Sequence, residues 1–88
     1  MSAAHLIVRG RVQGVFYRDW TVRTARQLGV TGWVRNLPDG TVEAHLEGAA
    51  DAIDAMAEKM REGPIAANVD TIERQGAEPE GHDTFERH

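Results

Sequence analysis

The chain contains no cysteine among its 88 residues. It can therefore form neither a disulfide framework nor a thiolate metal site, and nothing in it indicates an oxidising compartment. No apolar run approaches the roughly 20 residues of a membrane span, and residues 1–5 lack the basic and apolar stretches of a signal peptide. We therefore expect a cytoplasmic protein that does not associate with membranes.

Positive charge is also scarce, because 10 basic residues are outnumbered by 14 acidic ones and the net charge is −4. This balance argues against a module for duplex nucleic acid, whose phosphates require a basic surface. The charge is unevenly distributed, however. Residues 1–35 hold six arginines and one acid, a balance of +5, whereas residues 36–88 hold four bases and thirteen acids, a balance of −9. Chance segregation is one explanation, but we favour a basic half that attracts a small anionic substrate.

The length of the chain predicts one domain, residues 1–88, with one core and one site. No internal repeat, low-complexity tract or linker interrupts it. We expect a monomer.

Hydrophobic periodicity predicts seven elements. Residues 5–13 alternate as a strand does, with Leu6 and Val8 on one face and Arg9 and Arg11 on the other. Helical spacing predicts helices over residues 16–28 and 51–61, the first ended by Gly29 and the second by a Gly-Pro pair. Further strands are predicted over residues 30–35, 41–47 and 69–75, and a short edge strand over 84–88.

The order of these elements is β-α-β-β-α-β, with a fifth short strand at the end. Two helices on one face of an antiparallel sheet give an α+β fold, the ferredoxin-like split βαβ sandwich. In the strand over residues 41–47, we expect the even-numbered residues from Val42 to Leu46 to face the core. Glu43, His45 and Glu47 are expected to face solvent.

The segment Gly10-Arg11-Val12-Gln13-Gly14-Val15-Phe16-Tyr17-Arg18 takes the chain from a strand through a glycine turn into a helix. Backbone N–H groups at such a turn point outward unpaired, and the helix dipole adds partial positive charge. Gly14 can adopt the positive φ that curves amides around a phosphate, and Arg18 supplies a planar fork for two oxygens. The segment therefore predicts an anion site.

A second motif is Thr31-Gly32-Trp33-Val34-Arg35-Asn36-Leu37-Pro38-Asp39-Gly40. We expect the first two strands of the chain to lie side by side, which would bring Asn36 to the mouth of the glycine turn. A carboxamide there can orient a water molecule toward phosphorus, although it cannot act as a general base.

The residue types restrict the chemistry. No general acid accompanies the motif, so the leaving group must depart as a stable anion, and a carboxylate does so. The four histidines are scattered, and no cluster of carboxylates or histidines is spaced to hold magnesium or zinc, so we expect no metal and no cofactor. Hydrolysis of an activated phosphate without a metal is the chemistry that remains.

At these two motifs the sequence closely resembles the acylphosphatase family, small enzymes that hydrolyse the carboxyl–phosphate bond of acyl phosphates. The resemblance covers roughly residues 6–75. It implies a ferredoxin-like fold, phosphate binding by the backbone amides of Gln13, Gly14, Val15, Phe16, Tyr17 and Arg18 with the Arg18 guanidinium, and orientation of the nucleophilic water by Asn36. Arg18 and Asn36 are then the catalytic residues.

Three alternatives remain open at this point. An RNA-recognition module shares the element order, but the strand over residues 41–47 offers acids and a histidine where stacked aromatics are needed. A non-catalytic anion-sensing or regulatory domain would keep the loop without needing Asn36. The chain could also be a segment of a larger maturation enzyme, although its compactness favours a free-standing protein.

Overall fold

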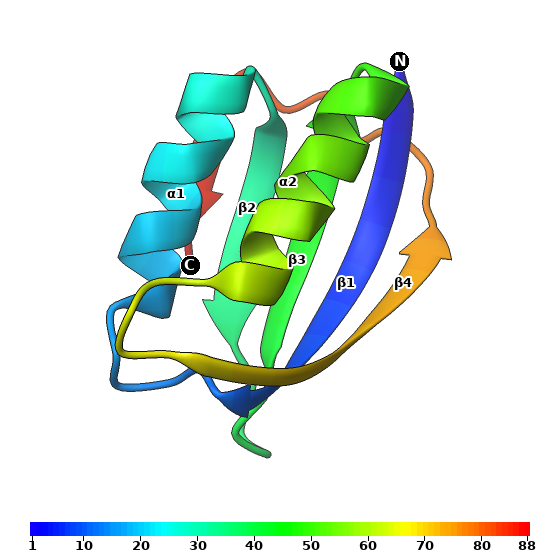
Figure 1. Ribbon diagram of the computed structural model, residues 1–88. Helices are drawn as coiled ribbons and strands as arrows, with labels where there is room; N and C mark the ends of the chain where they lie inside the picture. Colours follow the sequence, from blue (N-terminus) through cyan, green and yellow to red (C-terminus); the bar gives the residue numbers. More distant parts are fainter.

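The computed structural model covers residues 1–88 and consists of one sheet with two helices on one of its faces (Figure 1). The elements, in chain order, are β1 (Ser2–Arg11), α1 (Tyr17–Leu28), β2 (Thr31–Asn36), β3 (Val42–Gly48), α2 (Ala50–Glu62), β4 (Asn68–Gly76) and β5 (Phe85–Arg87). Each predicted element is present with its predicted type, and the ends differ by a few residues. The ferredoxin-like α+β sandwich is confirmed.

The five strands lie in the order β4-β1-β3-β2-β5. The four longer strands pair antiparallel, as predicted, whereas β5 runs parallel to β2 and makes the sheet mixed. The prediction that the first two strands are neighbours is wrong, because β3 lies between β1 and β2. In this fold the α1 crossover skips one strand position, and the next strand fills it by pairing with both neighbours.

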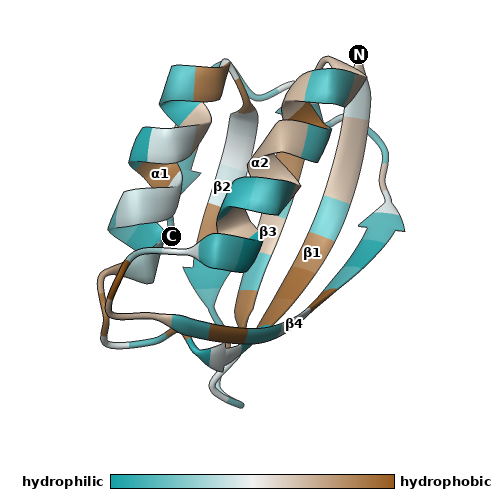
Figure 2. Cartoon of the chain, in the orientation of Figure 1, coloured by the Kyte–Doolittle hydropathy of each residue, from teal (hydrophilic) through white to brown (hydrophobic).

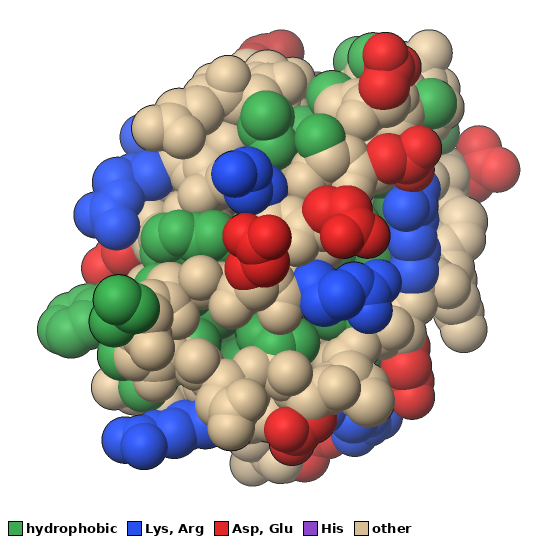
Figure 3. All heavy atoms as spheres, in the orientation of Figure 1, with side chains coloured by type: hydrophobic (Ala, Val, Ile, Leu, Met, Phe, Trp, Pro, Cys, Tyr) green, Lys and Arg blue, Asp and Glu red, His purple; other side chains and the backbone are tan.

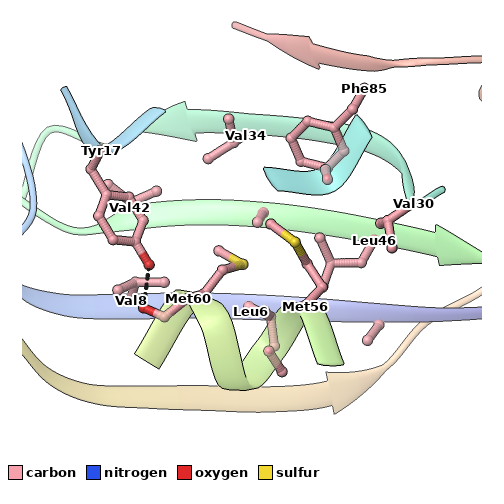
Figure 4. Packing of buried hydrophobic residues seen from close by; sticks show 14 of the residues in the cluster. Leu6, Val8, Tyr17, Val30, Val34, Val42, Leu46, Met56, Met60 and Phe85 are labelled. Atoms are coloured by element: carbon pink, nitrogen blue, oxygen red, sulfur yellow. Dashed lines mark hydrogen bonds between the residues drawn. The ribbon is translucent and has the colours of Figure 1, made fainter. Parts of the chain in front are cut away.

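The core lies between the sheet and the two helices. Figure 2 shows hydrophobic residues concentrated on strand segments beneath the helices, and Figure 4 shows side chains from both layers meeting there. Leu6, Leu46, Met56, Met60 and Phe85 are all fully buried. Met56 and Met60, four residues apart on α2, fill gaps in the core, and Phe85 fixes the short strand β5 to it.

The end of β1 is shaped by a glycine. The pairing of β1 with β4 shifts register between Arg9 and Gly10, and Gly10 has φ 131°. A Cβ atom at Gly10 would overlap the carbonyl oxygen of Asn68 on β4, so only glycine fits this close approach. After this irregularity the strand continues only to Arg11, where the loop that joins β1 to α1 begins. Neither helix combines the length and the apolar character that crossing a membrane requires.

Candidate active site

The loop between β1 and α1 presents a row of unpaired amides. Gly14 has φ 73°, as predicted, and Phe16 at the N-cap of α1 also adopts a left-handed conformation with φ 61°. No side chain caps the helix, and the backbone N–H groups of residues 13–19 donate to no acceptor in the protein. These amides and the N-terminus of α1 together form a concave donor array suited to an anion.

The left-handed Phe16 was not predicted, and its side chain is 79 % exposed. A bulky residue in this conformation is strained and persists only where its surroundings fix the backbone. Val15 beside it is buried, so its side chain anchors the loop from below. The strain therefore lies within the predicted anion site itself.

Gln13 connects this loop to the turn after β2. Its side-chain amide donates to the carbonyl oxygens of Leu37 and Thr41, each at 2.8 Å. The turn is closed by Asp39, whose carboxylate accepts from the amide and the hydroxyl of Thr41. These hydrogen bonds lower the pKa of Asp39. The loop and the turn thus meet through Gln13, although β1 and β2 are not neighbours.

The side chains of Arg18 and Asn36 line one cleft of about 240 Å³. Its walls also include Val12, Gly14, Phe16, Tyr17, Asp19 and Arg87. Five predicted site residues therefore line the cleft. Gln13 and Val15 do not line it with their side chains, since one bonds to the turn and the other enters the core.

Asn36 is the last residue of β2, where it pairs with Val42. Its carboxamide oxygen is buried and has no hydrogen-bond partner within the protein. A buried acceptor without a partner is uncommon and marks a functional position or a place for a bound water. Asn36 also lines the cleft, so a rotation of its side chain would bring this unpartnered oxygen to a water held there.

Arg18 is not engaged by its neighbour Asp19. Its Nη1 donates to the backbone oxygen of His88 at 2.7 Å, whereas Asp19 pairs with Arg87 at 2.8 Å. Sequence reasoning missed Asp19 and Arg87 as cleft residues. Arg87 lies in the predicted edge strand, but only the parallel pairing of β5 with β2 brings it beside Asn36, and the weak pattern of the tail gave no sign of that pairing.

The open face of the sheet carries a second polar cluster, which corrects an expectation. His45 and Glu47 were predicted to face solvent, but both are buried because residues 80–82 cover them. With Glu80 and His82 they place ligand-type atoms within 4.8 Å of one another. Two of the four histidines therefore lie together, and the expectation that carboxylates and histidines form no cluster is wrong.

Glu47 is the centre of this cluster. Its carboxylate accepts the backbone amides of Glu80, Gly81 and His82, and a ring nitrogen of His45 at 2.7 Å. Burial alone would raise the pKa of Glu47, but these hydrogen bonds outweigh it and lower the pKa to about 2. A carboxylate offers about four acceptor positions and all are used. Glu47 therefore anchors the segment that leads to β5.

Known proteins that resemble this chain were found by sequence and by structure. Residues 4–87 match the family model described as acylphosphatase. The chain is 61 % identical over 69 residues to an acylphosphatase from Bordetella parapertussis, covering 78 % of this chain and 73 % of that one. It is 55 % identical over 82 residues to an acylphosphatase from Trichormus variabilis, covering 93 % and 81 %. The crystal structure of acylphosphatase from Bacillus subtilis superposes with a TM-score of 0.97 at 34 % identity, covering 100 % of this chain and 99 % of that one.

Proposed function

The chain belongs to the acylphosphatase family, and on this premise we propose that Arg18 and the loop amides bind the phosphoryl group while Asn36 orients the attacking water. Its activity is the hydrolysis of acyl phosphates to a carboxylate and inorganic phosphate. The single observation that carries the assignment of residues is the shared cleft: Arg18 and Asn36, 18 positions apart in the chain, line it together with the free end of α1.

Binding begins at the loop. The unpaired amides of residues 13–18 offer hydrogen bonds to the non-bridging oxygens of the phosphoryl group, and the dipole of α1 favours their negative charge. The Arg18 guanidinium adds a planar fork that fits two of these oxygens. Because charge spreads over the same oxygens in the transition state of phosphoryl transfer, these donors stabilise the reaction as well as binding.

The nucleophile is a water molecule held by Asn36. The carboxamide oxygen, which has no partner within the protein, turns toward the cleft and accepts one of the hydrogens of this water. This hydrogen bond fixes the lone pair of the water toward phosphorus on the side opposite the acyl oxygen. Attack forms the new P–O bond while the bond from phosphorus to the acyl oxygen breaks, and its electron pair leaves with the carboxylate. The proton of the water passes to a phosphate oxygen or to solvent, since a carboxamide is not a base.

No acid is required for the leaving group, because a carboxylate with a conjugate-acid pKa of about 4 departs without protonation. The one carboxylate in the cleft, Asp19, is held in an ion pair with Arg87 at 2.8 Å. We therefore propose a reaction that needs no metal ion. The loop amides, Arg18 and Asn36 supply every group that this mechanism requires, so it needs no second copy of the chain, and we propose that the protein acts as a monomer.

The experiment is turnover of benzoyl phosphate in the presence of EDTA, with Arg18→Ala, Asn36→Ala and the exposed Arg61→Ala as a control. We expect wild type and Arg61→Ala to hydrolyse the substrate equally. Each cleft substitution should lower kcat/KM by about a hundredfold or more, because Arg18→Ala removes donors to the charge that develops on the phosphoryl group and Asn36→Ala removes the group that positions the water. Unchanged turnover in Asn36→Ala, or dependence on added metal, would overturn the mechanism.

A further inference from the structure

A second hollow, of about 410 Å³, lies between α1 and β5. It is lined by Asp19, Val22, Arg23, Arg26, Glu86 and Arg87, and we call it the arginine groove. Asp19 and Arg87 line both this groove and the catalytic cleft, so the two hollows share the wall formed by that ion pair. A substrate whose phosphoryl group lies in the cleft can therefore extend its acyl group over this wall into the groove.

The groove is built from one face of α1 and the adjacent edge strand. Asp19, Arg23 and Arg26 are separated by four and three residues, the spacing that aligns side chains along one side of a helix. Arg87 reaches the same place from β5. The sequence motif that contains Arg18 thus continues along α1 as a line of positive charge.

Two of the three arginines have guanidinium groups available to a ligand. Arg87 is engaged by Asp19 at 2.8 Å, and Arg26 donates one N–H to the carbonyl oxygen of Phe85 at 3.1 Å and has no carboxylate partner. Arg23 makes no hydrogen bond or ion pair within the protein. The groove holds three guanidinium groups against the carboxylates of Asp19 and Glu86, which leaves a positive balance.

The chemistry of the lining favours an anion over an apolar group. Val22 is the only hydrophobic residue of the six, and guanidinium forks match the geometry of carboxylates and phosphates. We propose that the arginine groove binds a second anionic group of the substrate, so that acyl phosphates whose acyl chain ends in a carboxylate are preferred. This inference rests on the proposed function, because it places the scissile phosphate in the neighbouring cleft.

The test compares substrates that differ only in the second charge. Butyryl phosphate and succinyl phosphate have four-carbon acyl groups, and only the second ends in a carboxylate; valeryl and glutaryl phosphate form the same pair with five carbons. We expect wild type to show a higher kcat/KM for the charged member of at least one pair, by about fivefold, the size typical of two exposed ionic contacts.

The matched variants are Arg23→Gln, the double variant Arg23→Gln with Arg26→Gln, and the control Arg61→Gln on α2. The double variant should lose the preference, which is a ratio of two kcat/KM values, while its kcat for butyryl phosphate changes less than twofold, which also shows that it is folded. Arg23→Gln alone, at an exposed position, should lose part of the preference, and the Arg61→Gln control should keep all of it. Arg23→Glu should reverse the preference.

Wild type without any preference in both pairs, or variants that keep the wild-type ratio, would overturn this inference. Those results would leave the cleft mechanism intact, because hydrolysis of the uncharged-chain substrates tests Arg18 and Asn36 separately. Loss of turnover for both members of a pair, by contrast, is the result expected only of damage to the cleft.

Discussion

Tyr17 illustrates how one side chain links the site to the core. Its ring is buried at the start of α1, and its hydroxyl donates to the carbonyl oxygen of Met60 at 2.7 Å (Figure 4). That carbonyl is among the last four of α2, to which no N–H group of the same helix donates a hydrogen bond. Burial raises the pKa of Tyr17 far above its usual range, so the hydroxyl remains a donor at any physiological pH.

We expect Tyr17→Phe to lower the free energy of unfolding by about 1–2 kcal/mol, because it leaves the buried carbonyl of Met60 without its donor. Urea denaturation measures this change. Turnover should stay close to wild type, since the phenyl ring still supports the loop. A variant as stable as wild type would show that the hydroxyl contributes nothing to the packing of the two helices.

Gly14 separates a backbone requirement from a packing requirement. It has φ 73°, yet a Cβ atom placed on it meets no atom within 4 Å. Gly14→Ala should therefore act through the backbone alone, at a cost of about 1 kcal/mol for the left-handed conformation. We expect inorganic phosphate to inhibit this variant about five- to tenfold more weakly. Gly14→Asn should lose less, because asparagine tolerates that conformation, and equal effects of the two would contradict the explanation.

At the scale of elements, the segment between β4 and β5 depends on one buried carboxylate. Glu47 accepts hydrogen bonds from the backbone amides of residues 80–82, shortly before β5. The strand β5 in turn carries Arg87 to the cleft. Removing the charge should therefore loosen the strand edge that forms one wall of the site. This role follows from the hydrogen bonds rather than from any contact of Glu47 with the cleft.

The pKa of Glu47 sets the pH range of this contribution. Because the folded value, about 2, is lower than the ordinary 4.5, the carboxylate stabilises the fold above pH 4.5, and this stabilisation is lost as the pH falls from 4.5 to 2. We expect Glu47→Gln to cost about 3 kcal/mol at pH 7 and progressively less below pH 4.5. Urea denaturation of both proteins across this range tests it, with the exposed Glu78→Gln as a control. A cost that does not change with pH would contradict the assignment.

Sequence patterns predicted the positions of the helices and strands better than they predicted which segments cover them. Alternation and helical spacing placed every helix and strand, since each reflects which face meets the core. The burial of His45 and Glu47 could not be read from alternation, because it results from an irregular segment folding over the open face of the sheet. For the same reason Arg87 was missed: its position depends on the pairing of β5, which three residues specify only weakly.

For the site, Arg18, Gly14 and Asn36 were predicted from chemistry and family resemblance, but the reason given for their proximity was wrong. They meet because Gln13 fixes the loop to the turn after β2. Its hydrogen-bond partners there, Leu37 and Thr41, lie 24 and 28 positions further along the chain. The local pattern around a glutamine contains no information about such a partner.

At the scale of the whole molecule, charge is distributed unevenly. Bases and acids alternate over the helical face (Figure 3), yet the cleft and the arginine groove contain four arginines, at positions 18, 23, 26 and 87. The net charge of −4 would repel an anionic substrate, whereas this local positive charge would attract it.

The two influences predict opposite effects of salt. If the local charge governs the approach of the substrate, raising KCl from 10 to 150 mM should lower kcat/KM for acetyl phosphate by about two- to fivefold and leave kcat unchanged. Steady-state kinetics in buffers of constant pH measure this. An increase of kcat/KM with salt would mean that the net negative charge dominates.

The central claim is a division of labour in one cleft, with Arg18 binding the phosphoryl group and Asn36 directing the water. The most direct measurement is the Kd of inorganic phosphate by calorimetry for wild type, Arg18→Ala and Asn36→Ala, beside kcat for an acyl phosphate. We predict that Arg18→Ala weakens phosphate binding more than tenfold, whereas Asn36→Ala binds phosphate within about twofold of wild type and loses about a hundredfold in kcat. Equal loss of phosphate binding in both variants, or phosphate binding by Arg18→Ala as tight as in wild type, would contradict it.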